Sequence, residues 1–221
     1  MTDWYFNETL KALEADTEKV TQHAYDHVVS KYCFDHNLPG LIKVLACEGY
    51  TQDYLTMLET CIRGTQFFHC SGRPDSDQVP TSLYLLERLY GPTYTDQHLD
   101  CVIGICKKDI YHFRSGQPLI VALIQKGCKT QDPRLLADYA SLGNLSMVKW
   151  LVEQGIDPIN EDAIIQAHLG YNQQALVDYL LEKSNNKEVL TSPKISELRS
   201  RYEERSEAEA QAYMDYMNMG Y

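Results

Sequence analysis

The feature that most constrains the fold of this chain is a pair of similar segments within residues 135–183. An Ala-x-Leu-Gly motif ends at Gly143 and recurs 27 residues later, ending at Gly170. A second block, with the pattern apolar-Val-x-aromatic-Leu-apolar-Glu, starts at Met147 and recurs 29 residues later from Leu176. The difference between the two spacings indicates a turn that tolerates insertion, and the apolar intervals of three and four are typical of buried helix faces. Each copy is therefore predicted to be a helix, a tight turn and a second helix.

A single helix pair of this kind cannot bury its own apolar face. A repeat of this length therefore predicts that neighbouring pairs stack and share one core. Ala140 and Ala167 precede the two glycines by a short turn, where small side chains let two helices approach closely. Trp150 and Tyr179 hold equivalent positions on the second helices, and this spacing predicts packing between neighbouring pairs rather than stacking on nucleobases.

Looser copies of the pattern lie nearer the N-terminus. Residues 41–49 and 119–127 are alike, and residues 83–91 form a weaker third version. Each copy ends in glycine, the residue preferred where a helix terminates. With the two paired segments included, the predicted helix ends are Gly49, Gly91, Gly127, Gly155 and Ser184.

The residues of the paired segments resemble the ankyrin repeat, whose core pattern is roughly A-A-x-x-G-x-x-x-x-V-x-x-L-L-x-x-G-A-D. The matching positions are Tyr139-Ala140, Gly143, Val148, Leu151-Val152 and Gly155-Ile-Asp157 in one copy, and Ala167, Val177 and Leu180-Leu181 in the next. The T-P-L-H-x-A opening of that family is missing, and the resemblance covers about a quarter of the chain. It implies stacked helix pairs whose first helices line a concave, protein-binding face.

The predicted fold class is all-α, a short ankyrin-like solenoid of helical hairpins with an irregular N-terminal helical portion. Residues 71–80 are polar and rich in turn formers, which predicts an exposed loop or linker. Three parts follow: an N-terminal helical region at 1–72, ankyrin-like repeats at 81–190, and a capping helix with an acidic tail at 191–221. In the first part we expect one helix ending near Asp16, a second beginning at Thr17 and a chain break at residues 37–40.

Composition excludes several classes of function. A net charge of −11 argues against binding to a phosphate backbone, which requires a basic surface. No apolar run approaches the roughly 20 residues of a membrane span, and the first residues lack the features of a signal peptide. Seven irregularly spaced cysteines form a poor disulfide framework. The sequence thus predicts a cytoplasmic protein without nucleic-acid partner or membrane span, and leaves the oligomeric state open.

Few residues carry a signal for chemistry. Cys33-x-x-His36 has metal-ligand spacing and His69-Cys70 could complete a set of four, but a shared helix face explains the first pair more simply. Phosphate-binding glycine loops, the His-Glu-x-x-His motif and the G-x-S-x-G elbow are all missing from the sequence. We therefore predict no metal, no cofactor and no catalytic residue. An enzyme or enzyme inhibitor, with its activity in the N-terminal half and target selection by the repeats, is the alternative.

The C-terminal end carries a second resemblance. An acidic block that starts at Glu203-Glu204, followed by an apolar end from Tyr213, resembles the export signal of effectors secreted by type IV systems of intracellular bacteria. Such effectors often carry ankyrin repeats, so the combination implies translocation into the host cytosol and binding to a host protein. A solvated helix end is the simpler explanation of the glutamates. A virus-encoded ankyrin protein that antagonises host defence is the closest variant.

The predicted function is therefore binding to another protein, without catalysis, through the concave face and the loops between repeats. The candidate contact residues lie on or after the first helices, or in the loop between the two copies. They are Asp138, Tyr139, Asp157, Asn160, His168 and Tyr171. For Tyr139 and His168, burial against the adjacent repeat is the competing interpretation.

Overall fold

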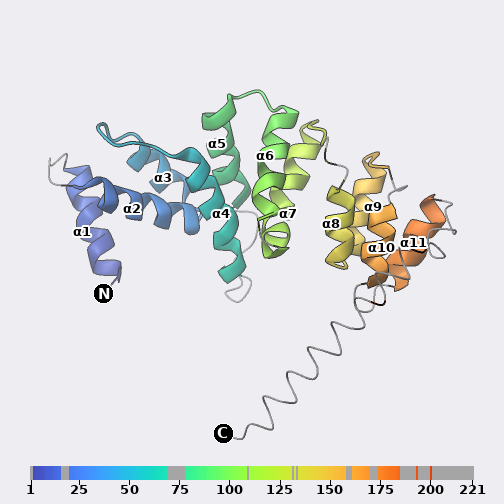
Figure 1. Ribbon diagram of the computed structural model, residues 1–221. Helices are drawn as coiled ribbons and strands as arrows, with labels where there is room; N and C mark the ends of the chain where they lie inside the picture. The colour runs from blue at the N-terminus through green and yellow to red at the C-terminus, as the bar shows by residue number, and fades with distance from the viewer. Residues whose placement is uncertain are drawn as a thin grey trace, which may run out of the picture. The chain divides into compact units, whose positions relative to one another are not determined.

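The structure of the chain, a computed structural model, describes residues 2–15, 20–68, 78–108, 110–130, 132, 134–157, 161–169, 174–184, 193 and 200. Eleven helices and no strand occur among these residues (Figure 1), which confirms the predicted all-α class. None of the helices in this described part combines the length and hydrophobicity of a membrane span. The predicted acidic tail and most of the predicted capping helix lie outside the described residues.

The helices fall into two compact units, divided between Gln131 and Asp132. The first unit contains α1 (Thr2–Glu14), α2 (Gln22–Phe34), α3 (Leu38–Leu45), α4 (Tyr54–Phe68), α5 (Gln78–Tyr90), α6 (Asp96–Cys106) and α7 (Ile110–Gln125). The second contains α8 (Leu135–Ser141), α9 (Leu145–Glu153), α10 (Glu161–Leu169) and α11 (Gln174–Ser184).

This division differs from the domain boundary predicted near residues 72–81. Helix α4 lies before that boundary, yet it packs against α5 and α7, which lie after it. Leu58 and Ile62 on α4, and Leu85 on α5, are completely buried. Since these side chains share one core, the polar segment connects two helices of the same unit. The polar segment also ends earlier than predicted, because residues 78–80 form the first turn of α5 and Gln78 is buried.

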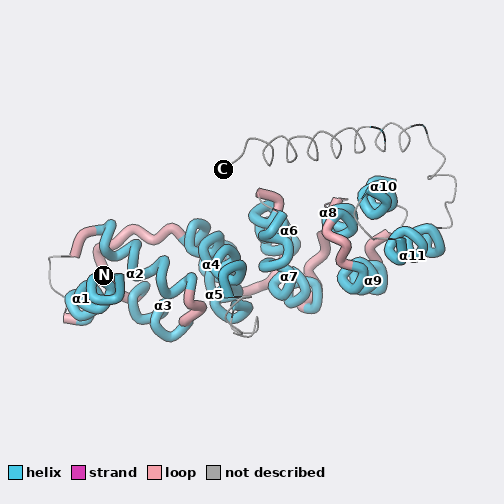
Figure 2. Tube along the Cα trace, turned by 90° about the horizontal axis from the view of Figure 1, so that it is seen from below, coloured by secondary structure: helices cyan, strands magenta, loops and turns pink. Residues whose placement is uncertain are grey.

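Consecutive helices of the first unit pack in pairs. Helix α2 contacts α3, α4 contacts α5 and α6 contacts α7, and contacts of α4 with both α2 and α7 join the pairs. Figure 2 shows α4 beside α5 and α6 beside α7. The apolar face of each helix is buried in these contacts, as expected for pairs that cannot form a core alone.

The second unit contains the two copies recognised in the sequence. The first helices, α8 and α10, pack against each other, and each contacts its own second helix, α9 or α11. Ala140 on α8 and Ala167 on α10 are both buried, in agreement with the predicted close approach. On the second helices, the Lys149 ammonium lies 5.4 Å from the centre of the Tyr179 ring. Helices α9 and α11 are therefore neighbours as well.

Three of the predicted helix ends are confirmed by backbone geometry, whereas α3 ends at Leu45, before the predicted Gly49. Gly91, Gly127 and Gly155 follow α5, α7 and α9 with φ angles of 94°, 93° and 91°. This left-handed conformation strains any residue with a side chain, which is why glycine stands at these positions.

Two helices begin elsewhere than the sequence predicts. The Thr21 hydroxyl accepts a hydrogen bond from the Ala24 amide, so α2 starts after Thr21 instead of at Thr17. The Asn37 side chain accepts from the Gly40 amide at 3.0 Å, so residues 38–40 are the first turn of α3 and not a break. Pro39 fits in this turn because an amide there would have no acceptor within the helix.

Helix α7 also departs from expectation, because it starts at Ile110 and continues through Pro118. The pattern predicts a helix only from residue 119 onward. Proline removes one backbone hydrogen bond within a helix. Phe113, Leu119 and Ile120 are buried on both sides of it, so tertiary packing stabilises the helix across this position.

Candidate functional site

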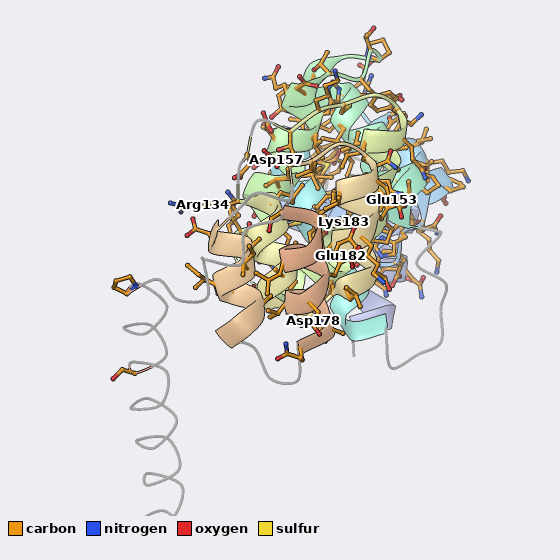
Figure 3. The ribbon with its side chains drawn as sticks, turned by 90° about the vertical axis from the view of Figure 1, so that its right-hand side faces the viewer. Arg134, Glu153, Asp157, Asp178, Glu182 and Lys183 are labelled. Carbon is orange, nitrogen blue, oxygen red and sulfur yellow. The ribbon has the colours of Figure 1, made fainter. Side chains whose placement is uncertain are left out.

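A surface groove of ≈ 360 Å³ lies between the first helices of the second unit. It is lined by residues from α8, from the position directly before it and from α10: Arg134, Ala137, Asp138, Ser141, Asp162 and Gln166. Figure 3 shows Arg134 at the α10 side of this unit, whereas Glu153, Glu182 and Lys183 lie toward α9 and α11. The groove and the outer surface of the second helices are therefore separate faces.

Helix periodicity brings the groove residues together. Positions spaced by three and four share one side of a helix, as do 138 and 141 on α8 with 134 directly before it, and 162 and 166 on α10. Asp138 is half-buried, whereas Arg134, Asp162 and Gln166 are exposed. Ala137 is only 5% exposed and supplies an apolar part of the lining. The result is a polar groove with two carboxylates and one guanidinium.

The predicted contact residues are only partly brought together. Asp138 lines the groove, whereas Asp157 is exposed in the segment between α9 and α10 and is not one of the residues that line the groove. Asn160 and Tyr171 lie outside the described residues, and His168 belongs to α10 but its side chain is not described. These positions stay predictions.

Tyr139 requires a correction. Its side chain is 0% exposed, so it cannot contact a partner in this conformation. One residue along a helix turns the side chain by about 100°, which carries position 139 from the groove side occupied by Asp138 into the core. Burial against the neighbouring helices, the competing interpretation, is the one observed.

Five groove residues were missed in the sequence: Arg134, Ala137, Ser141, Asp162 and Gln166. The four polar ones lie on the polar face of α8 or α10, or directly before α8, where a solvated surface and a binding surface have the same composition. Two features of the sequence could have indicated these residues: the i, i+4 and i+7 spacing that starts at Arg134, and the alignment of the two copies.

A buried histidine in the first unit has a structural role. The Thr95 amide donates to His98 Nδ1 at 3.2 Å, and His98 Nε2 lies 3.2 Å from the carbonyl oxygen of Gly91, to which it donates in this tautomer. The ring thus joins the start of α6 to the turn before it, in the manner of a capping box. Both ring nitrogens are engaged by the backbone.

The described cysteines that could take part in metal binding or catalysis are buried, which makes them poor ligands and nucleophiles. Cys33 is fully buried on α2, while His69 and Cys70 lie outside the described residues. Across the described positions, no group of three or more side chains is arranged to hold a metal ion. Burial, followed by a hydrogen bond with Cys33, raises the pKa of the Cys61 thiol. Burial also raises the pKa of Cys106 to about 12.

These thiols are expected to resist alkylation in the native protein. Raising the pKa of Cys106 from 9.0 to about 12 lowers its thiolate fraction about 1000-fold at neutral pH. Iodoacetamide at about pH 8 should therefore modify the half-exposed Cys47 well before Cys61 or Cys106. Peptide mapping by mass spectrometry after timed quenching checks the order. Equal rates for Cys47 and Cys106 in the folded chain would contradict it.

No protein-family model matches the chain, and no curated protein or solved structure shows significant similarity to it. The groove and the packing of the helices around it are therefore the basis for a functional proposal. The resemblances to the ankyrin repeat and to type IV effectors stay predictions.

Proposed function

We propose that the chain is a non-enzymatic protein-binding module, an ankyrin-like array of stacked helix pairs that captures another protein at the groove between α8 and α10. One observation carries the proposal. The two first helices lie side by side, bury one face of each, and present polar side chains from both in a common groove. In an ankyrin-like array, this is the concave, partner-binding side.

The charge of the second unit supports a protein partner. Between residues 132 and 184 the chain has eight acidic and three basic residues. Such a surface repels nucleic acid and attracts basic proteins, and it accelerates encounter with them. The effector hypothesis adds a host protein as the partner. Its sequence support lies in residues 203–221, outside the described part of the chain, so the groove proposal does not depend on it.

The test is charge reversal within the groove. Asp138→Lys combined with Asp162→Lys is expected to weaken capture of the partner by about tenfold or more, because it places two cations where the partner meets two carboxylates. Capture is measured by affinity purification from cell lysate with the full chain as bait, quantified by mass spectrometry, and then by titration of the purified partner.

The matched control reverses the same number of charges on the other face. Glu153→Lys combined with Glu182→Lys changes α9 and α11, on the side seen in Figure 3, and should leave capture within about twofold of wild type. Circular dichroism must show the same helix content in both double variants. If the control abolishes capture and the groove variant retains it, the groove is not the binding site. Retained capture by both variants would direct attention to the first unit, where the enzyme alternative places the activity.

A further inference from the structure

Two cysteine side chains meet in the core of the first unit. Cys33 lies near the end of α2, and Cys61 lies in the middle of α4. Both side chains are completely buried, and α2 packs against α4. The Cys61 thiol is in hydrogen-bonding contact with the Cys33 thiol. Two helices that are separate in the sequence therefore bring their sulfur atoms together.

The start of α5 packs against the same region. The Thr81 hydroxyl donates a hydrogen bond of 3.2 Å to the backbone oxygen of His36, just beyond the end of α2. Helix α5 also packs against α4, and its buried Ser82 faces the Cys61 thiol. The end of α2, the middle of α4 and the first turns of α5 thus enclose the two sulfur atoms.

An unpartnered polar side chain marks this start of α5. Gln78 lies one helical turn before Ser82, is completely buried, and forms no hydrogen bond with any described residue through its amide nitrogen or oxygen. A buried amide without a partner costs free energy that it recovers when water reaches it. The first turn of α5 therefore opens at reduced cost, and such local opening admits a small polar molecule to the sulfur atoms.

We propose that Cys33 and Cys61 form a reversible disulfide when the protein meets hydrogen peroxide, and that this bond locks α2 to α4. One thiolate attacks a peroxide oxygen and the O–O bond breaks. The sulfur becomes a sulfenic acid, and the released hydroxide takes up the proton that the thiol lost, giving water. The second sulfur then attacks the sulfenic sulfur. The S–S bond forms, the S–O bond breaks, and a second water leaves with the remaining thiol proton.

Proximity decides this outcome. A sulfenic acid formed at either position touches the other thiol, so its condensation is intramolecular and precedes further oxidation to sulfinic acid. Burial raises the pKa of the Cys61 thiol, which makes the first step slow and agrees with the expected resistance to iodoacetamide, a larger reagent. The bond lies within the first unit, so it acts apart from the groove between α8 and α10.

The test maps the disulfide by mass spectrometry in the full chain carrying Cys47→Ala. Trypsin would otherwise leave Cys47 and Cys61 together on the peptide of residues 44–63, whereas Cys33 is on residues 32–43. The folded protein is held for hours in about 1 mM hydrogen peroxide, and the remaining thiols are then alkylated in denaturant. We expect the two peptides to be recovered as one linked species that dithiothreitol separates.

Hydrogen exchange measures whether the bond locks the helices. Amides of α2 and α4 that exchange only when the two helices separate should exchange at least about tenfold more slowly in the oxidised chain, because the crosslink restricts that opening. Cys106→Ala, which removes another completely buried thiol, is the matched control and should retain the slowing. Cys33→Ala and Cys61→Ala should each abolish it.

Four results would overturn the inference. They are recovery of both thiols in reduced form, sulfinic acid at either position without a linked peptide, linkage of either cysteine to a different one, and linkage that forms only in denaturant. The proposed function is judged separately, because capture of the partner depends on the groove variants and not on these cysteines.

Discussion

Replacing Tyr139 with alanine is expected to lower the free energy of unfolding of the α8–α11 unit by about 3–5 kcal/mol, the range for large aromatic truncations in a core. The side chain is 0% exposed, so its removal leaves a cavity among helices that pack against α8. Because this unit has few helices, little other packing remains to compensate for the lost contacts. Truncation of a contact residue on the surface would instead change the free energy of unfolding very little.

Unfolding of the second unit can be followed separately. The chain has two tryptophans, Trp4 in α1 of the first unit and Trp150 in α9 of the second. In a Trp4→Phe background, tryptophan fluorescence in urea reports only on the second unit. The control is Ser146→Ala, an exposed change on α9 expected to remain within about 0.5 kcal/mol. A Tyr139→Ala loss below about 1 kcal/mol would show that the ring is not a core element.

Replacing Gly116 with alanine is expected to destabilise the first unit by about 1–3 kcal/mol, the usual penalty for overpacking. Alanine favours a helix interior over glycine by about 1 kcal/mol, so without a steric conflict the change would stabilise α7. A β-carbon at Gly116, however, would lie 2.4 Å from the Cys106 sulfur on α6. Cys106 is completely buried and cannot move into solvent.

Two variants test that explanation for Gly116. Cys106→Ala removes the sulfur, so Gly116→Ala in that background should be neutral or stabilising, with a favourable coupling of about 1–3 kcal/mol between the two sites. Gly104→Ala, on the exposed side of α6 with nothing within 4 Å of the new β-carbon, should stabilise the chain by about 0.4–1 kcal/mol.

Hydrogen exchange of the amides in α6 and α7 measures these effects locally. Equal destabilisation by Gly116→Ala with and without the Cys106 sulfur would reject the close approach of the two helices.

Much of the local structure could be predicted because it depends on local chemistry. The helix-ending glycines at positions 91, 127 and 155 require a backbone conformation that other residues resist, and this preference is visible in the sequence. The two repeated segments likewise formed helix pairs, since their apolar spacing matches the helix period. The start positions of α2 and α3 were predicted less accurately, because several polar residues near each start could equally well cap the helix.

The candidate site was predicted only through Asp138. Its neighbour Tyr139 carries the same local signal, yet it is turned into the core. Arg134 and Asp162, by contrast, lie on polar helix faces that look like any solvated surface until α8 and α10 are placed side by side. A groove made by two helices is a property of their packing, and no periodicity within one helix encodes it.

The sequence by itself determined that the chain is helical, where several helices end, and that two pairs repeat in its second half, because apolar periodicity and glycine preference act within a few residues. Only the tertiary structure decided that the units divide between Gln131 and Asp132, that α7 continues through Pro118, and which polar side chains meet in the groove. Each of these depends on how much apolar surface distant helices bury together, and that free energy exists only once the helices are in contact.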